Sequence, residues 1–214
     1  DASIDVAFPI KQWPNRIPES LLGVVTRKRP VAVAVWTTTP WTLPANVALA
    51  FHPEAQYVIV HQKGWSYDLL VAERLAPKLA AILKASEPIP TGGALGKDLN
   101  GLRCQTPFSD RLSVALTDPG VSMDDGTGIV HIAPGHGQED YIIGQREKLD
   151  VLSPVDHQGR FTKEVPQFAG QTVFDANPKI IVDLRARGLL LAEEPITHSY
   201  PHCWRCRQPV IFRA

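Results

Sequence analysis

The sequence has few cysteines and no long apolar run, and each shortage excludes a class of protein. Three cysteines in 214 residues are too few for the paired disulfide framework of a small secreted protein. No apolar stretch approaches the roughly 20 residues that span a bilayer, and no basic N-terminal segment precedes an apolar one. We therefore expect a cytoplasmic protein that has no membrane partner.

The sequence also lacks an excess of charge of either sign. Lysine plus arginine and aspartate plus glutamate both total 22, so the formal net charge is zero. An extended nucleic-acid footprint needs a positive field, so any RNA contact should be small and local. A hydrophobic content of 44% is enough for a folded core, and we expect a monomer.

Prolines and glycines are spread along the whole chain and divide it into short segments. The 19 prolines and 15 glycines favour a β-rich mixed domain of the α+β class over a helical bundle. Apolar alternation and β-branched runs predict strands at Ser3–Phe8, Val31–Trp36, Tyr57–His61, Leu112–Thr117 and Ile129–Ile132. Helical spacing predicts helices at Ala72–Ala85, at Pro178–Arg187 with Asp175 or Asn177 as N-cap, and from about Gln138, and Pro88–Asn100 is predicted as a loop.

The first motif with chemical content is WTTTPWTLPAN, which directly follows a predicted buried strand. Thr37, Thr38, Thr39 and Thr42 are interrupted by prolines, so neither a strand nor a helix can continue regularly through them. Hydroxyl groups at a strand end could hold ribose hydroxyls, an ester carbonyl and a water molecule. The alternative is a threonine-rich edge strand, or a helix cap that precedes Leu43–Ala50.

The second motif, GTGIVHIAPGHGQEDY, predicts a strand, a glycine-rich turn and the start of a helix. Asp140 in the first helical turn could pair with a substrate ammonium, or it could merely complement the helix dipole. His131 at the strand end could line a pocket, or it could be a hydrogen-bonded core residue. A metal site made of His131, His136 and Asp140 is a weaker alternative, because Pro134 and Gly135 separate the two histidines.

The third motif is HCWRC, in which Cys203 and Cys206 have the spacing of half a zinc knuckle. A structural zinc ion needs four ligands, and the sequence has no second Cys-x-x-Cys. His198 and His202 could complete a site only with an unusual spacing. We expect a half site, with zinc bound only if ligands come from outside these residues.

Together, the order and separation of the three motifs resemble the editing domain, connective peptide 1 (CP1), of class I isoleucyl-tRNA synthetases. The resemblance covers essentially the whole chain, with residues 1–197 as the editing domain, residues 1–20 as its leading strand, and residues 198–214 as the return to the catalytic domain. It implies a mixed domain centred on a β-barrel. Thr39 stands before Pro40, where valyl and leucyl relatives usually have arginine.

The resemblance also implies roles for individual residues. Trp36, Thr37, Thr38, Thr39 and Thr42 would bind the substrate and position the catalytic water. Asp140 would hold the α-amino group, and His131 would line the side-chain pocket and help to exclude isoleucine.

The activity implied is hydrolysis of the ester bond by which valine is wrongly attached to isoleucine tRNA. The sequence leaves open how far valyl-adenylate is also hydrolysed before valine is transferred to the tRNA. Editing would need no cofactor, and the partners would be the 3′ acceptor end of the valylated tRNA and the rest of the synthetase. The signatures of amino-acid activation, HIGH and KMSKS, are missing, so we expect no activation by these residues. The alternative function is a non-catalytic tRNA-binding or zinc-ribbon module.

Overall fold

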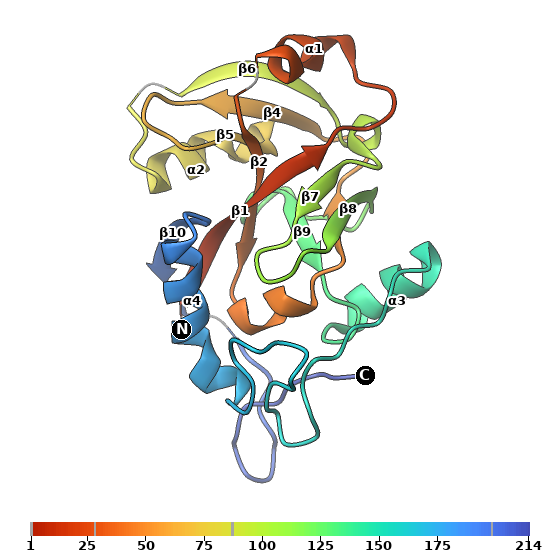
Figure 1. Ribbon diagram of the computed structural model, residues 1–214, viewed down its shortest axis with the longest axis vertical. Coiled ribbons are helices and arrows are strands. Elements are labelled where there is room, and N and C mark those ends of the chain that lie inside the picture. Colours follow the sequence, from red (N-terminus) through yellow and green to blue (C-terminus); the bar gives the residue numbers. More distant parts are fainter. Residues whose placement is uncertain (1, 28, 87, 198) are drawn as a thin grey trace.

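The computed structural model describes residues 2–27, 29–86, 88–197 and 199–214, and a strongly curved mixed sheet dominates it (Figure 1). The strands are β1 (Ala2–Gln12), β2 (Val31–Thr37), β3 (Ala48–Phe51), β4 (Gln56–His61), β5 (Asp68–Ala72), β6 (Ile89–Leu95), β7 (Arg103–Gln105), β8 (Leu112–Thr117), β9 (Ile129–Ile132) and β10 (Leu190–Pro195). The α-helices are α1 (Glu19–Thr26), α2 (Ala76–Ile82), α3 (Gln138–Glu147) and α4 (Val173–Ala186). Short 3-10 helices are η1 (Pro40–Ala45), η2 (Glu73–Leu75) and η3 (Gly96–Leu99).

The strand order is β6-β4-β5-β2-β1-β7-β8-β3-β9, and β10 pairs with the first half of β1. Most neighbours are antiparallel, whereas the β2–β5 and β3–β8 pairs are parallel. The curvature brings β9 into contact with β2, but within the described residues the end strands β6 and β9 are not paired. The predicted mixed α+β domain is confirmed, with the correction that its sheet is not closed into a barrel.

All five predicted strands are present, because each carries the apolar residues that form the core. Phe8 in β1, Val33 in β2, Ile59 in β4 and Ile129 in β9 are at most 2% exposed. The predicted helix from Gln138 is confirmed as α3. Every helix in the described part of the chain is too short or too polar to span a membrane.

Two helix boundaries differ from the prediction. The segment predicted as one helix over Ala72–Ala85 begins as the end of β5, and its α-helix covers only Ala76–Ile82. The helix predicted from Pro178 begins at Val173. Its N-cap is Thr172, whose hydroxyl accepts a hydrogen bond from the Asp175 amide, so neither Asp175 nor Asn177 caps it.

The prediction of a loop over Pro88–Asn100 is wrong, because β6 and η3 occupy most of it. β6 pairs with β4, and α1 packs on β6. A Cβ atom added to Gly92 would lie 2.8 Å from the carbonyl oxygen of Ser20, and one on Gly93 would lie 2.6 Å from that of Tyr57. The glycines that suggested a loop therefore allow close packing on this strand.

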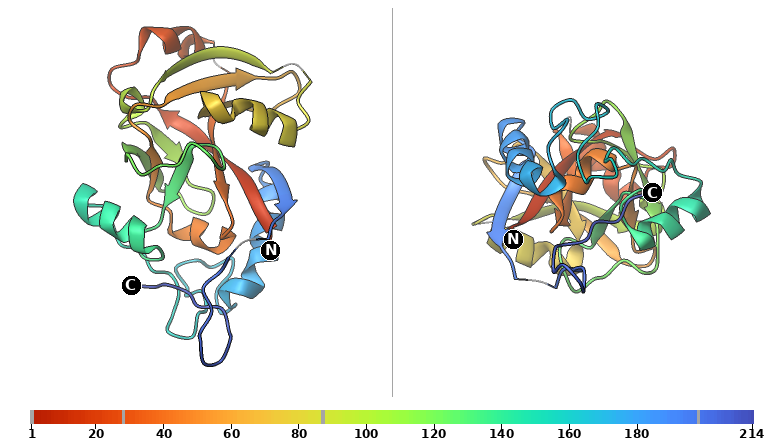
Figure 2. Two further views of the ribbon diagram at one scale, coloured as in Figure 1. Left: turned by 180° about the vertical axis from the view of Figure 1, so that it is seen from behind. Right: turned by 90° about the horizontal axis from the view of Figure 1, so that it is seen from below.

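The sheet and its helices α1 and α2 form one end of the molecule, and the loops after α3 and the C-terminal segment form the other (Figures 1 and 2). The short helix η1 lies between these two parts, and all six of its residues are buried. It follows β2 directly and precedes β3, so it connects two strands that are far apart in the sheet order. The threonine motif is therefore held at the boundary between the sheet and the C-terminal loops.

Candidate functional site

The hydroxyl groups of the threonine motif are ordered by contacts within the motif. The Thr37 hydroxyl accepts a hydrogen bond from the Thr39 amide at 3.1 Å and lies 3.3 Å from the Thr39 hydroxyl. The Thr42 hydroxyl donates to the Thr39 carbonyl at 2.9 Å. Pro40 begins η1, where its missing N–H costs nothing. The Thr37 and Thr39 hydroxyls are thus in contact, and the Thr42 hydroxyl is tied to the Thr39 backbone.

His131 extends this network from β9, which contacts β2. Its Nε2 lies 2.9 Å from the Thr42 hydroxyl, and its Nδ1 lies 3.5 Å from the side-chain nitrogen of Asn46. The Asn46 amide also donates to the Ala48 carbonyl at 2.9 Å. The imidazole is therefore held at both ring nitrogens by residues of the threonine motif.

These contacts determine where the proton of His131 lies. The Thr42 hydroxyl uses its one hydrogen on the Thr39 carbonyl, so it can only accept from His131. Nε2 must then carry the proton, and Nδ1 accepts from Asn46. Burial, with a smaller contribution from His136, lowers the pKa of His131 to about 4, so the ring is neutral at pH 7.

Asp140 lies in the first turn of α3, and its carboxylate bridges back to the preceding turn. Oδ2 accepts a hydrogen bond from the Ala133 amide at 2.8 Å. Burial raises the pKa of Asp140 above its ordinary value, while the Ala133 hydrogen bond and the nearby His136 act in the opposite direction. One carboxylate oxygen is thus committed to the backbone, and the other has no hydrogen bond to the described residues.

His136 joins the turn to η1. Its ring packs edge-on against Trp41, with centroids 5.0 Å apart, and its Nδ1 donates to the Phe212 carbonyl at 3.0 Å. Its Nε2 is buried and has no hydrogen-bond partner in the described residues. Trp41 and His136 therefore join η1 to the turn before α3, separately from the contact between Thr42 and His131.

A cavity of about 170 Å³ adjoins the threonines. Its walls come from the threonine motif, from α4 and from the C-terminal segment, and its lining residues are Thr38, Thr39, Trp41, Phe174, Asn177, Tyr200, His202 and Pro209. Hydroxyl, amide, imidazole and aromatic groups share this small space. It is suited to a small ligand that has both polar and apolar parts.

Thr38 and Thr39 are the predicted site residues that line this cavity, and the structure places Trp36 on another face of the sheet. Consecutive strand residues point to opposite faces, so Trp36 and Thr37 lie on different sides of β2. The Trp36 side chain lines a separate cavity together with Asp5 and Lys78. Its role in substrate binding stays a prediction.

Cys203 and Cys206 lie in a tight turn of the C-terminal segment. The Cys203 amide donates to the Gln208 carbonyl, and Arg207 has a positive φ of 59°. Hydrogen bonds from the Cys206 and Arg205 amides, with a further one from the Cys206 thiol, lower the pKa of Cys203. Nδ1 of His202 donates to the Tyr200 carbonyl, and His198 lies outside the described residues. Two thiols fit half of a zinc site, and no third ligand is placed beside them in the described chain.

The sequence does not predict Asn46 and Trp41, which are in the threonine motif itself, as binding or positioning residues. Nor does it predict the cavity-lining residues Phe174, Asn177, Tyr200 and Pro209 in such a role. The spacing of Asn46 four residues after Thr42 was the available signal. The alternative metal site is not supported, because the described residues contain no group of three or more ligands placed to hold a metal ion.

Comparison with known proteins identifies relatives across nearly the whole chain. No family model matches it. The isoleucine–tRNA ligases of Nitratidesulfovibrio vulgaris (strain DP4) and Desulforamulus reducens (strain ATCC BAA-1160 / DSM 100696 / MI-1) are 47% and 43% identical over 212 and 213 residues. Each alignment covers 99% of this chain, which spans only 22% of either relative.

Among solved structures, the fold is similar to that of leucyl-tRNA synthetase editing domains. The crystal structure named GlLeuRS-CP1 has a TM-score of 0.70 at 16% identity, covering 92% of this chain and 100% of that one. The Plasmodium falciparum cytosolic leucyl-tRNA synthetase editing domain has a TM-score of 0.67 at 11% identity, covering 88% and 98%. At these identities the likeness concerns the fold alone.

Proposed function

Because this chain belongs to the isoleucyl-tRNA synthetase family and has the fold of a CP1 editing domain, we propose that it hydrolyses valine wrongly esterified to isoleucine tRNA. The observation that carries the proposal is the chain of contacts from Thr39 through Thr42 to His131, beside a small mixed cavity. The same segment is linked through Trp41 and His136 to the Asp140 turn.

Each part of this arrangement has a task in ester hydrolysis. The hydroxyl groups of Thr37 and Thr39 are neutral donors and acceptors that can orient an attacking water and a ribose hydroxyl. The uncommitted oxygen of Asp140 can bind the ammonium of the amino acid, because a charge-assisted hydrogen bond is strong in a partly buried site. Fixed donors near the ester carbonyl would stabilise the negative charge that develops on its oxygen.

Editing is chemically necessary because valine is smaller than isoleucine by one methylene. A pocket that accepts isoleucine rejects valine by only about 1–3 kcal/mol. A second, smaller pocket can accept valine and exclude isoleucine by size. Hydrolysis of valyl-adenylate before transfer would be a further activity of the same pocket, and neither reaction requires a cofactor.

The partners we propose are the 3′ acceptor end of valylated isoleucine tRNA and the rest of the synthetase, in the cytoplasm. The balanced charge favours contact with the acceptor end alone, with the remainder of the enzyme supplying most of the affinity. We propose that the chain itself is a monomer, and that Cys203 and Cys206 bind zinc only when ligands from outside these residues complete the site.

The test is deacylation of valylated isoleucine tRNA by this chain with Asp140→Asn. Asparagine keeps an oxygen for the Ala133 amide but removes the negative charge, so the fold should be retained. We expect the rate to fall at least tenfold. The matched control is Glu139→Gln, which removes the neighbouring exposed charge and should leave the rate unchanged.

Equal rates in the two variants would contradict the role of Asp140. Absence of valine release by the unmodified chain, together with tRNA binding, would instead favour the non-catalytic tRNA-binding alternative. Circular dichroism of both variants separates either result from a loss of structure.

A further inference from the structure

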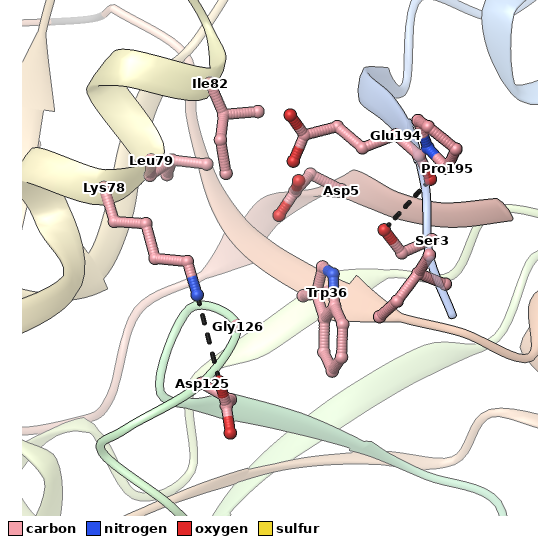
Figure 3. A pocket seen from close by; sticks show the side chains of 11 residues that line it. Ser3, Asp5, Trp36, Lys78, Leu79, Ile82, Asp125, Gly126, Glu194 and Pro195 are labelled. Carbon is pink, nitrogen blue, oxygen red and sulfur yellow. Dashed lines mark hydrogen bonds and ion pairs between the residues drawn. The ribbon is translucent and has the colours of Figure 1, made fainter. Parts of the chain in front are cut away.

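A second cavity, of about 510 Å³, is lined by Trp36 and is shown in Figure 3. Trp36 and Thr37 point to opposite sides of β2, so the cavity lies on the face away from Thr37. Its floor consists of strand residues that share one face. Asp5 of β1 is paired with Trp36 of β2, and Ser3 of β1 is paired with Glu194 of β10. Directly paired residues project to the same side, so these four side chains line one surface.

The other wall comes from α2 and from the loop before β9. Leu79 and Ile82 supply an apolar patch, and Lys78 faces Asp125 with an Nζ to Oδ1 distance of 3.9 Å. At Gly126, which has a φ of 64°, an added Cβ atom would lie 3.1 Å from the ring of Trp36. The loop therefore lies directly against the indole and closes that side of the cavity.

The carboxyl group of Asp5 is the unusual feature of this cavity. Asp5 is only 4% exposed, and its side chain has no hydrogen bond or ion pair within the described residues. Figure 3 shows it side by side with the carboxylate of Glu194, with both directed into the cavity. Its oxygens are not among the fully buried polar atoms that lack a partner, so they open into the cavity that Asp5 lines, where a ligand would satisfy them.

The charge and the apolar surface select the class of ligand. Three carboxyl groups, those of Asp5, Asp125 and Glu194, face one lysine, so the cavity has an excess of negative charge. Lys78 is half exposed and turned toward Asp125, which leaves Asp5 without a direct cationic partner. Anions would be repelled, and no three ligands are placed to hold a metal ion in the described residues. The indole of Trp36 and the aliphatic groups of α2 favour a cation that carries an alkyl chain.

We propose that this cavity binds an aliphatic ammonium ion, held by the carboxylates of Asp5 and Glu194 and packed against Trp36. The site lies on the other side of β2 from the Thr37 hydroxyl, so it is separate from the hydroxyl network of the threonine motif. Burial and the nearby Glu194 raise the pKa of Asp5 to about 7, while Lys78 acts in the opposite direction. Binding of the cation therefore displaces a proton from Asp5 at neutral pH.

Titration calorimetry of the whole chain with n-butylammonium chloride tests the proposal, with potassium chloride at equal ionic strength as the reference. We expect saturable binding that is about tenfold tighter at pH 8 than at pH 6, because Asp5 is mostly ionised only at the higher pH. In Asp5→Asn, binding should weaken and lose this pH dependence.

The matched pair of variants is Glu194→Gln and Glu193→Gln. The two residues are adjacent on β10, but Glu193 faces the other side and pairs with Arg185 at 2.7 Å. Glu194→Gln should weaken binding at least fivefold, and Glu193→Gln should leave it unchanged. Equal effects of the two variants, or heats no larger than those of potassium chloride, would overturn the proposal. Both variants are at exposed positions, so the comparison does not depend on Asp5→Asn folding.

Discussion

The Nε2 of His131 lies 2.9 Å from the hydroxyl of Thr42, and this contact joins β9 to the buried helix η1. The two residues are 89 positions apart in the sequence. Through this contact His131, which is only 9% exposed, supports the hydroxyl network of the threonine motif. The geometry thus favours a positioning role for His131 over the pocket role that the family resemblance implies.

For His131→Ala, we expect the rates of deacylation of valylated and isoleucylated tRNA to fall together. Loss of the imidazole leaves the Thr42 hydroxyl and the Asn46 side-chain amide without this hydrogen-bond partner. The free energy of unfolding should therefore fall by roughly 1–3 kcal/mol. Rates are measured on tRNA charged separately with each amino acid, well below the melting temperature. Thr42→Ser, which keeps the hydroxyl, is the control. A selective rise in isoleucine release would show instead that His131 faces the substrate.

Gly137→Ala should move Asp140 without disturbing the rest of the domain. A Cβ atom at Gly137 would lie 2.9 Å from Cγ of Asp140, and the end of that side chain can shift more easily than the backbone. The carboxylate should lose its hydrogen bond to Ala133, so we expect a severalfold lower rate of valine release. The check is a deacylation assay together with thermal unfolding. A normal rate would mean that the position of the carboxylate is not critical.

The elevated pKa of Asp5 predicts a stability that depends on pH. In the unfolded chain Asp5 ionises near its ordinary pKa of 3.8, whereas in the folded chain it keeps its proton until about pH 7. Its contribution to the free energy of unfolding therefore falls as the pH rises from about 4 to 7 and stays low above pH 7. Asp5→Asn removes this effect. The free energy of unfolding of Asp5→Asn minus that of the parent should therefore be about 2–3 kcal/mol larger at pH 8 than at pH 5.

Urea unfolding of the parent and of Asp5→Asn at the two pH values measures this difference directly. All other titrating groups are common to the two proteins. The pH dependence of the difference between their free energies of unfolding therefore comes from Asp5. A difference that is independent of pH would show that Asp5 ionises normally in the folded state.

The two cysteines of the C-terminal turn predict the metal content of the isolated chain. Cys203 and Cys206 supply two thiolates, and a closed structural site needs four ligands. After dialysis, we expect far less than one zinc ion per chain by elemental analysis, and no change in melting temperature on addition of a chelator. One tightly held zinc ion per chain would mean that other ligands, such as His202 or a second chain, complete the site.

The strands could be predicted where a side-chain pattern follows from burial, as in Val31–Trp36. The side-chain pattern does not predict a strand where packing against neighbouring elements decides the conformation. Gly92 and Gly93 indicated a loop, but they form a strand because a helix and a neighbouring strand approach closely there. Likewise, the composition does not reveal that Thr172 rather than Asp175 or Asn177 is the N-cap of α4.

The site could be predicted within each motif but not between motifs. The sequence places Thr39 and Thr42 close together, yet the contact of Thr42 with His131 depends on the path of β3 between them. The alternation of strand residues was sufficient to separate Trp36 from Thr37, although the motif groups them together. Tyr200 reaches the cavity through the C-terminal segment, which no local pattern indicates.

The pairing of β1 with β10 also bears on how the protein folds. The Ser3 hydroxyl donates to the Glu194 carbonyl across 191 residues, whereas β7 and β8 are neighbours along the chain. Closing so long a loop has a large entropic cost, so contacts of this separation form after the local hairpins. Among the described strands β10 has β1 as its only partner. We therefore expect the backbone amides of β10 to exchange hydrogen early, and the carboxyl pair of Asp5 and Glu194 to assemble only in the last step of folding.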